Sequence, residues 1–338
     1  MTKNNENRIE CLQCGHIFQY DTTNIFRHFW VTNDRHYRYE HVSDCIVCPV
    51  CNQRIDIKKE KACYELPIKI PPHGLETENN ECKRWLYNMG IYITGDLHGE
   101  IDIKKLSFNN WPESRDLTRE DVLIITGDFG LPFWPTETFT LNNDMRQYEK
   151  DDNKIYHYWI QWLSERPYTI LFVDGHHECF PYWNKQPESI LFGGRVQQHP
   201  DAANVYHLCR GEYYTIQDRT FWVMGGANSF DKEWRTKGVN WWKEEIPSIT
   251  EMEHGLNTLA AHDNKVDYIV THTMPQKLIE PVLGVGYESE PTQSYLDTVY
   301  DRAQFKEWFC GHFHRDLTDI DYNIQVLYNT ITKVGVYC

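Results

Sequence analysis

Eight aspartate and histidine side chains stand at the ends of five short apolar runs, and their types suit metal-assisted chemistry. They are Asp96 and His98 after "IYIT", Asp128 after "VLIIT", His176 and His177 after "TILFV", His272 after "YIV", and His312 and His314 after "FKEWF". The two pairs spaced two residues apart, in "DLH" and "HFH", project to one side if the backbone is extended. Mixed carboxylate and imidazole ligands favour Mn, Fe, Zn, Ni or Co over Ca or Mg. Two such ions held close together are a known device for phosphoester hydrolysis.

Each of these residues also has an ordinary structural explanation when it is taken alone. An aspartate that follows glycine, as Asp128 does, is often a turn residue or a helix cap. A single histidine such as His272 is more often hydrogen-bonded within the fold than bound to a metal. The shared position of all eight residues after apolar runs favours a common site.

The elements that must position these residues alternate between strands and helices. The apolar runs have the length and composition of buried strands, and 153–165, "NKIYHYWIQWLSE", is long enough for a helix. Buried strands that alternate with helices predict an α/β domain. In such sheets, ligands bind beyond the carboxyl ends of the strands, where these polar residues fall.

The motifs "GDLHG", "GDFG", "GHHE", "THTMP" and "GHFH" occur in this order over about residues 90 to 328. The series resembles that of the calcineurin-like metallophosphoesterases: D-x-H, G-D-x-x-D, G-N-H-[E/D], a lone His and G-H-x-H. The resemblance implies a sandwich of two β-sheets flanked by helices. The segment "GGANSFDKEWRTKGVNWW" is similar to a bacterial and phage subgroup whose substrate is unassigned.

Site roles follow from the resemblance, position by position. It implies a first divalent ion on Asp96, His98, Asp128 and His314, and a second on Asp128, His176, His272 and His312. It implies that His177 assists the leaving group as a proton donor, while a metal-activated hydroxide attacks phosphorus. Glu178 would be a supporting residue.

The chain departs from the family pattern at two positions. His176 stands where the family has Asn, so we expect a preference for Zn, Fe, Ni or Co; loss of the second ion is the alternative. Leu131 replaces the later acid of G-D-x-x-D, which leaves His177 without a recognisable orienting partner. Arg210 and Arg235 are potential phosphate contacts, but we expect both to be surface residues.

The N-terminal region carries two C-x-x-C pairs, Cys11 with Cys14 and Cys48 with Cys51, while Cys45 offers an alternative spacing. Such pairs suit one tetrahedral structural zinc and resemble a zinc ribbon. The stretch between them interleaves aromatic and basic residues, so the ribbon would bind a protein or a nucleic acid. The core of a small β-hairpin is the structural alternative.

Composition limits the binding partners and the cellular compartment that we expect for this protein. A net charge of −15 disfavours an anionic membrane or general nucleic-acid coating. The N-terminus lacks the apolar core of a signal peptide, and clustered cysteines suit a reducing compartment, so we predict a cytoplasmic protein. The expected domains are a zinc ribbon at 1–62, a connection at 63–88 and a metallophosphoesterase domain at 89–338.

The sequence therefore predicts a metal-dependent phosphatase or phosphodiesterase with two active-site divalent ions and one structural zinc. Its substrate would be a phosphorylated small molecule, a nucleotide or a nucleic acid. One alternative is a metal-binding scaffold of the same fold that has lost turnover. Another is a nuclease that the zinc ribbon recruits to its substrate.

Overall fold

The chain divides into two compact units, Met1–Asn80 and Glu81–Cys338. The computed structural model describes strand backbones between residues 7 and 69, and residues 89–133, 145–286 and 288–335, with only the backbone at 145–154. The predicted zinc ligands Cys11, Cys14, Cys48 and Cys51 lie outside the described residues.

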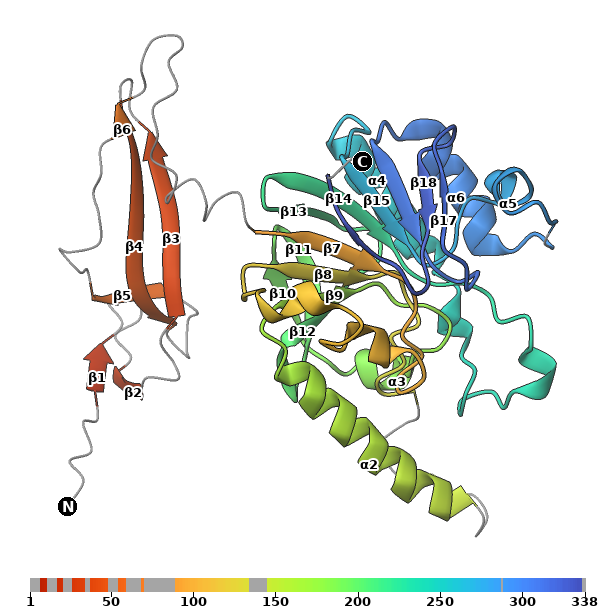
Figure 1. The fold of residues 1–338 in the computed structure, drawn as a ribbon, viewed down its shortest axis with the longest axis horizontal. Coiled ribbons are helices and arrows are strands. Elements are labelled where there is room, and N and C mark those ends of the chain that lie inside the picture. The colour runs from red at the N-terminus through yellow and green to blue at the C-terminus, as the bar shows by residue number, and fades with distance from the viewer. Residues whose placement is uncertain are drawn as a thin grey trace. The chain divides into compact units, whose positions relative to one another are not determined.

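The described part of the N-terminal unit consists of antiparallel strands (Figure 1). Strand β1 (Asn7–Glu10) pairs with β2 (Ile17–Tyr20), and β4 (Tyr37–Val47) pairs with β3 (Phe26–Asn33), β5 (Arg54–Lys58) and β6 (Ile68–Lys69). Strand β6 lies within the predicted connection at 63–88.

Two sheets dominate the described part of the C-terminal unit (Figure 1). The first has seven strands: β10 (Glu188–Leu191), β11 (Gly194–His199), β12 (Ala202–Leu208), β9 (Thr169–Phe172), β8 (Val122–Ile125), β7 (Ile91–Thr94) and β19 (Ile331–Lys333). The second has six: β13 (Tyr213–Ile216), β14 (Arg219–Met224), β15 (Tyr268–Thr271), β16 (Glu307–Cys310), β18 (Ile324–Val326) and β17 (Leu317–Asp319). Each sheet has a parallel centre of four strands, and antiparallel strands form its edges.

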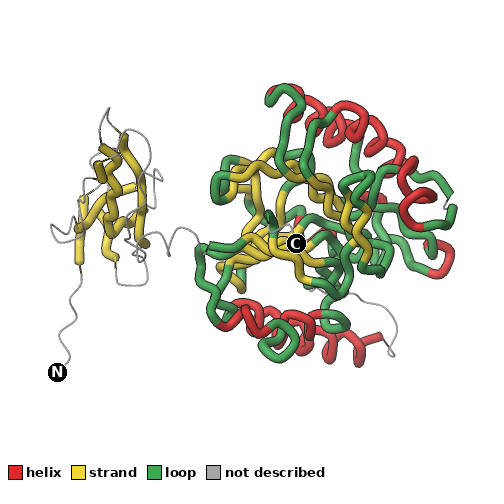
Figure 2. The backbone as a smooth tube through the Cα atoms, turned by 45° about the horizontal axis from the view of Figure 1, so that its top comes forward, coloured by secondary structure: helices red, strands yellow, loops and turns green. Residues whose placement is uncertain are grey.

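Helices cover the outer faces of the sheets, as Figure 2 shows. The α-helices are α2 (Met145–Ser164), α3 (Phe180–Trp183), α4 (Ile249–Ala261), α5 (Gln276–Leu283) and α6 (Pro291–Arg302); short 3₁₀ turns are η2 (Ile103–Leu106), η3 (Pro112–Arg115), η4 (Lys232–Trp234) and η5 (Lys243–Glu245). The predicted helix at 153–165 is the last part of α2, which begins eight residues earlier, at Met145.

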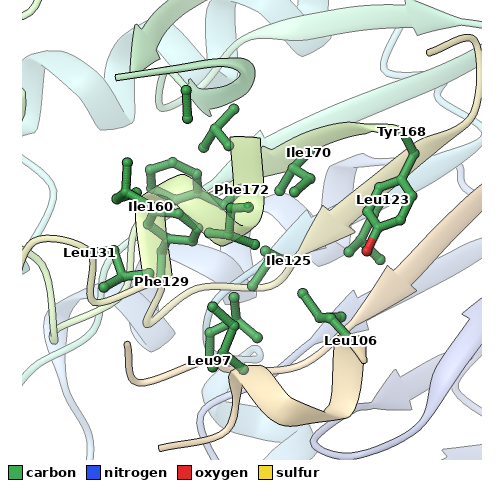
Figure 3. Close-up of a cluster of buried hydrophobic side chains, with 14 of the residues drawn as sticks. Leu97, Leu106, Leu123, Ile125, Phe129, Leu131, Ile160, Tyr168, Ile170 and Phe172 are labelled. Carbon is green, nitrogen blue, oxygen red and sulfur yellow. The ribbon is translucent and has the colours of Figure 1, made fainter. Parts of the chain in front are cut away.

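Apolar side chains on both faces of the central strands explain why both faces of each sheet are buried. In β8, Val122 and Ile124 pack between the two sheets, whereas Leu123 and Ile125 pack on the side of α2. Successive strand side chains point to opposite faces, so an unbroken apolar run such as "VLII" supplies both cores. Figure 3 shows the core on the α2 side, where Leu131 packs with its neighbours. The two-sheet α/β architecture that the sequence predicted is confirmed.

Among the helices that the structure describes, none combines the length and the apolar composition that a bilayer span needs.

Candidate metal centre

The predicted site residues come together from both sheets, at the carboxyl ends of five parallel strands. Strands β7, β8 and β9 of the first sheet precede three of the motifs, and β15 and β16 of the second sheet precede the other two. Two groups of three side chains place one ligand atom each within 4.8 Å of one another: Asp96, His98 and His314, and His176, His272 and His312. Asp128 belongs to further groups of this kind, one with His98 and His177 and one with Asp96 and His272.

Asp128 lies at the centre of this arrangement. Its carboxylate is fully buried, and its Oδ1 accepts hydrogen bonds from the backbone N–H groups of His176 (2.8 Å) and His177 (2.9 Å). Oδ1 also lies 3.4 Å from His272 Nε2. The other oxygen, Oδ2, accepts no hydrogen bond from the residues that the structure describes, and His98 Nε2 is 3.2 Å away. A buried carboxylate oxygen without a donor is an expected place for a cation.

Asp96 is held by the turn that carries two other candidate ligands. It is also fully buried, and the backbone N–H of His312 donates to its Oδ1 at 3.1 Å and its Oδ2 at 3.0 Å. His314 Nε2 lies 3.4 Å from Asp96 Oδ2. A Cβ added to Gly311 would stand 2.0 Å from Asp96 Oδ1, so the glycine in "GHFH" permits this close approach.

Hydrogen bonds on the far side of the imidazole rings fix which nitrogen faces the site. His272 Nδ1 donates to the carbonyl of Thr126 (2.9 Å), and His98 Nδ1 donates to Asp102 Oδ2 (2.7 Å). A carbonyl and a carboxylate accept only, so Nε2 of each ring is left to face the centre. Asp102 was not among the predicted site residues, although its position four residues after His98 could have indicated it.

The two buried carboxylates and the imidazoles shift one another's protonation. Burial raises the pKa of Asp96, and Asp128 adds to the rise. Burial disfavours a proton on His98 and on His272, but the carboxylates of Asp128 and Asp96 and the hydrogen bonds of each ring together outweigh it. The pKa of His98 rises to about 9 and that of His272 to about 10. The centre thus attracts positive charge.

Four candidate ligands also adopt left-handed backbone conformations. The φ angles are 45° at His98, 45° at Asp128, 69° at His312 and 49° at His314. Non-glycine residues rarely adopt such angles, and those that do gather at functional sites. The donor set, the Asp128 oxygen without a hydrogen bond and this strain together fit the binding of divalent cations.

His177 has a partner that the sequence analysis did not identify. Its Nε2 lies 3.1 Å from Nη2 of Arg235, and its ring stacks on Phe133. Burial, supported by the Arg235 guanidinium, lowers the pKa of His177 to about 4. Leu131 stands where the family pattern has its later acid. Its side chain is 3% exposed and packs in an apolar cluster, where a carboxylate would be unfavourable.

The prediction that two arginines lie on the surface is wrong. The Arg235 side chain is only 9% exposed, and its Nε pairs with Asp231 Oδ1 at 2.7 Å. Arg210 is 7% exposed and binds the buried Asp174. Both arginines are paired with carboxylates, which is how folded proteins accommodate buried cations.

Two further charged residues hold the site loops. Glu178 is fully buried and accepts hydrogen bonds from the backbone N–H groups of Phe129 (2.7 Å) and Gly130 (3.0 Å), which agrees with its predicted supporting role. Lys105, which the sequence analysis missed, donates to the carbonyl oxygens of Gly95 and Asp96. Burial lowers the pKa of Lys105 to about 8.

The comparison with protein families agrees with this geometry. A family model described as calcineurin-like phosphoesterase matches residues 89–316, which include all eight predicted active-site residues. No match was found among curated proteins.

Proposed function

We propose, from the premise that this chain belongs to the calcineurin-like phosphoesterase family, that it is a metal-dependent hydrolase of phosphoesters. The observation that carries the proposal is the pair of three-ligand groups, Asp96/His98/His314 and His176/His272/His312, with Asp128 beside both. Mn, Fe, Zn, Ni and Co are the ions that this mixture of nitrogen and oxygen donors suits.

Each group would hold one divalent ion, and Asp128 would contact both. When bound, the two ions supply Lewis acidity and lower the pKa of a coordinated water to near neutrality. His176 would act as a ligand in place of the family Asn. Its Nδ1 lies 3.2 Å from His272 Nε2 and 3.4 Å from Asp128 Oδ1, a separation that a shared cation would favour.

His177 would assist the leaving group, with Arg235 as its partner. A guanidinium only donates, so His177 Nε2 accepts the present hydrogen bond and the neutral ring carries its proton on Nδ1. A proton on Nε2 requires Arg235 to turn away, for example toward the phosphate of a bound substrate. His177 would take up this second proton from solvent to become an imidazolium. The P–O bond to the leaving group would then break as the imidazolium passes the proton to the departing oxygen and returns to its neutral form.

The N-terminal unit would hold one structural zinc on Cys11, Cys14, Cys48 and Cys51. In the sequence, the first pair falls between the antiparallel partners β1 and β2, and the second pair falls between β4 and β5. Two C-x-x-C pairs supply the four thiolates that a tetrahedral structural zinc needs, which supports this assignment. The resemblance to a bacterial and phage subgroup remains a prediction.

Elemental analysis combined with turnover tests the proposal. We expect about three metals per chain, falling to about two in Cys48→Ser/Cys51→Ser. The manganese- or nickel-loaded protein should hydrolyse 4-nitrophenyl phosphate or bis(4-nitrophenyl) phosphate, and Asp128→Asn should lose both turnover and active-site metal. A fully loaded protein that hydrolyses neither ester would favour the alternative of a scaffold without turnover.

A further inference from the structure

The segment 225–248 takes no part in the sheets, yet it reaches the candidate metal centre. It connects β14 to α4, and Figure 1 shows its central part extending away from the strands. Two of its side chains contact predicted site residues. The ring of Phe230 lies 5.9 Å from that of His312, and Arg235 donates to His177.

Two of the four aromatic rings in this segment are largely exposed. The exposed fraction is 89% for Trp234 and 53% for Phe230, although most large apolar side chains of the described unit are buried. Trp234 directly precedes Arg235 in the chain, so consecutive residues carry the exposed indole and the guanidinium beside His177. Exposed aromatic rings beside a functional site are typical of surfaces that bind a ligand.

The same segment carries no net charge within a strongly acidic protein. Residues 225–248 contain four Lys or Arg residues and four Asp or Glu residues, whereas the whole chain has a net charge of −15. Lys232 and Lys237 place their Nζ atoms 5.3 and 5.6 Å from the centre of the Trp241 ring. Asp231 orients Arg235 through a 2.7 Å ion pair. Such a mixture of cations and π-faces suits nucleotides, because bases stack on the rings and phosphates pair with the cations.

We propose that segment 225–248 recognises a nucleotide, so that the substrate is a nucleotide phosphoester. Arg235 contacts the phosphate beside His177, and Phe230 and Trp234 offer faces on which the base stacks. This inference rests on the proposed phosphoesterase function and narrows it to one substrate class.

Three phosphodiesters with the same leaving group test the inference on the full-length, manganese-loaded protein. They are thymidine 5′-(4-nitrophenyl phosphate), methyl 4-nitrophenyl phosphate and benzyl 4-nitrophenyl phosphate. We expect kcat/KM for the thymidine ester to exceed that for the methyl ester by at least about fivefold, the lower end of a base-stacking contribution. Trp234→Ala should abolish most of this ratio. Tyr158→Ala, which removes an exposed aromatic ring from α2, should leave it unchanged.

Other results would overturn the inference. Equal kcat/KM for the thymidine and methyl esters would show that the nucleoside is not recognised. A benzyl ester as good as the thymidine ester would show recognition of any aromatic group, including a phosphotyrosine side chain.

A binding experiment separates this inference from the proposed function if no ester is hydrolysed. Calorimetry would compare thymidine 5′-phosphate with inorganic phosphate on the same manganese-loaded protein. If thymidine 5′-phosphate binds more tightly than inorganic phosphate, and Trp234→Ala removes this difference, nucleotide recognition is supported. Only the proposed hydrolysis would then be rejected. Equal binding would reject nucleotide recognition as well.

Discussion

Removal of the Asp174 carboxylate should strongly destabilise the C-terminal unit, because Arg210 would remain as a buried cation without its main partner. Asp174 is 2% exposed and accepts hydrogen bonds from Arg210 Nε at 2.9 Å, from Arg210 Nη2, and from His207 Nε2 at 3.0 Å. Breaking a buried pair from one side costs about 3–5 kcal/mol. Glu251 Oε2, 3.5 Å from Arg210 Nη1, and the Glu244 carbonyl would still face the cation, so we expect the lower end, about 3 kcal/mol.

Urea denaturation followed by tryptophan fluorescence measures this loss in Asp174→Ala. With an m value of about 3 kcal/mol per molar, the midpoint should fall by about 1 M. The control is Asp174→Ala/Arg210→Met, which removes both charges and should recover at least half of the loss. A double variant as unstable as the single variant would refute the reasoning, since the unpaired charge would then not be the cause.

The pH dependence of the free energy of unfolding provides a second test of the Asp174–Arg210 pair. Burial works against the charged form of Asp174, but Arg210 and His207 outweigh it and hold the pKa of this carboxyl well below its usual range. A depressed carboxyl pKa stabilises the folded state above the unfolded value of about 4, and this contribution is lost as the pH falls further. The difference in stability between the wild type and Asp174→Ala should therefore shrink between about pH 5 and pH 3.

Three further outcomes concern the candidate metal centre. Gly311→Ala should lower metal affinity by about 10- to 100-fold in a chelator competition, because its Cβ would meet Asp96 Oδ1 at 2.0 Å. Zinc affinity measured by calorimetry should rise with pH from 6.5 to 8.5, with proton release, because His98 (pKa about 9) and His272 (pKa about 10) hold protons that the metal must displace. His176→Asn should shift the metal preference of turnover toward Mn, and unchanged metal content and preference would mean that His176 is not a determining ligand.

The sequence indicated the strand ends and the residues that follow them, because both depend on local patterns. An unbroken apolar run such as Val122–Ile125 reports a strand that is buried on both faces, and the polar residue after it must lie at the edge of the sheet. The short spacings in "DLH" and "HFH" pointed to candidate ligands, although the backbone there is not extended, since φ is 45° at His98 and 69° at His312. His312 and His314 belong to different groups of candidate ligands. Local patterns alone therefore identified eight residues that the structure brings close together.

The partners of the site residues could not be predicted, because they come from distant parts of the chain. Arg235 reaches His177 from a loop of the other sheet, 58 residues along the chain, and no local spacing connects the two. An isolated arginine is exposed in most proteins, so the pattern favoured the wrong environment for Arg210 and Arg235 alike. Only the fold brings Asp174 close enough to pair with Arg210, which is 36 residues away along the chain. Asp231, in contrast, stands four residues before Arg235, so this pair has a local spacing.

The geometry of the centre is unfavourable for the folded chain unless positive charge lies beside its carboxylates, which protonated imidazoles or a bound cation would supply. Two fully buried carboxylates, Asp96 and Asp128, lie close together, and backbone at φ > 0 costs about 1–3 kcal/mol at each strained residue. The rest of the unit must offset these terms, and its two-sheet core supplies extensive apolar burial. A chain that used these residues only for structure would gain stability by replacing the carboxylates with apolar side chains. The two carboxylates stand within groups of Asp and His side chains that could hold a metal ion, which distinguishes this centre from a cluster of histidines alone.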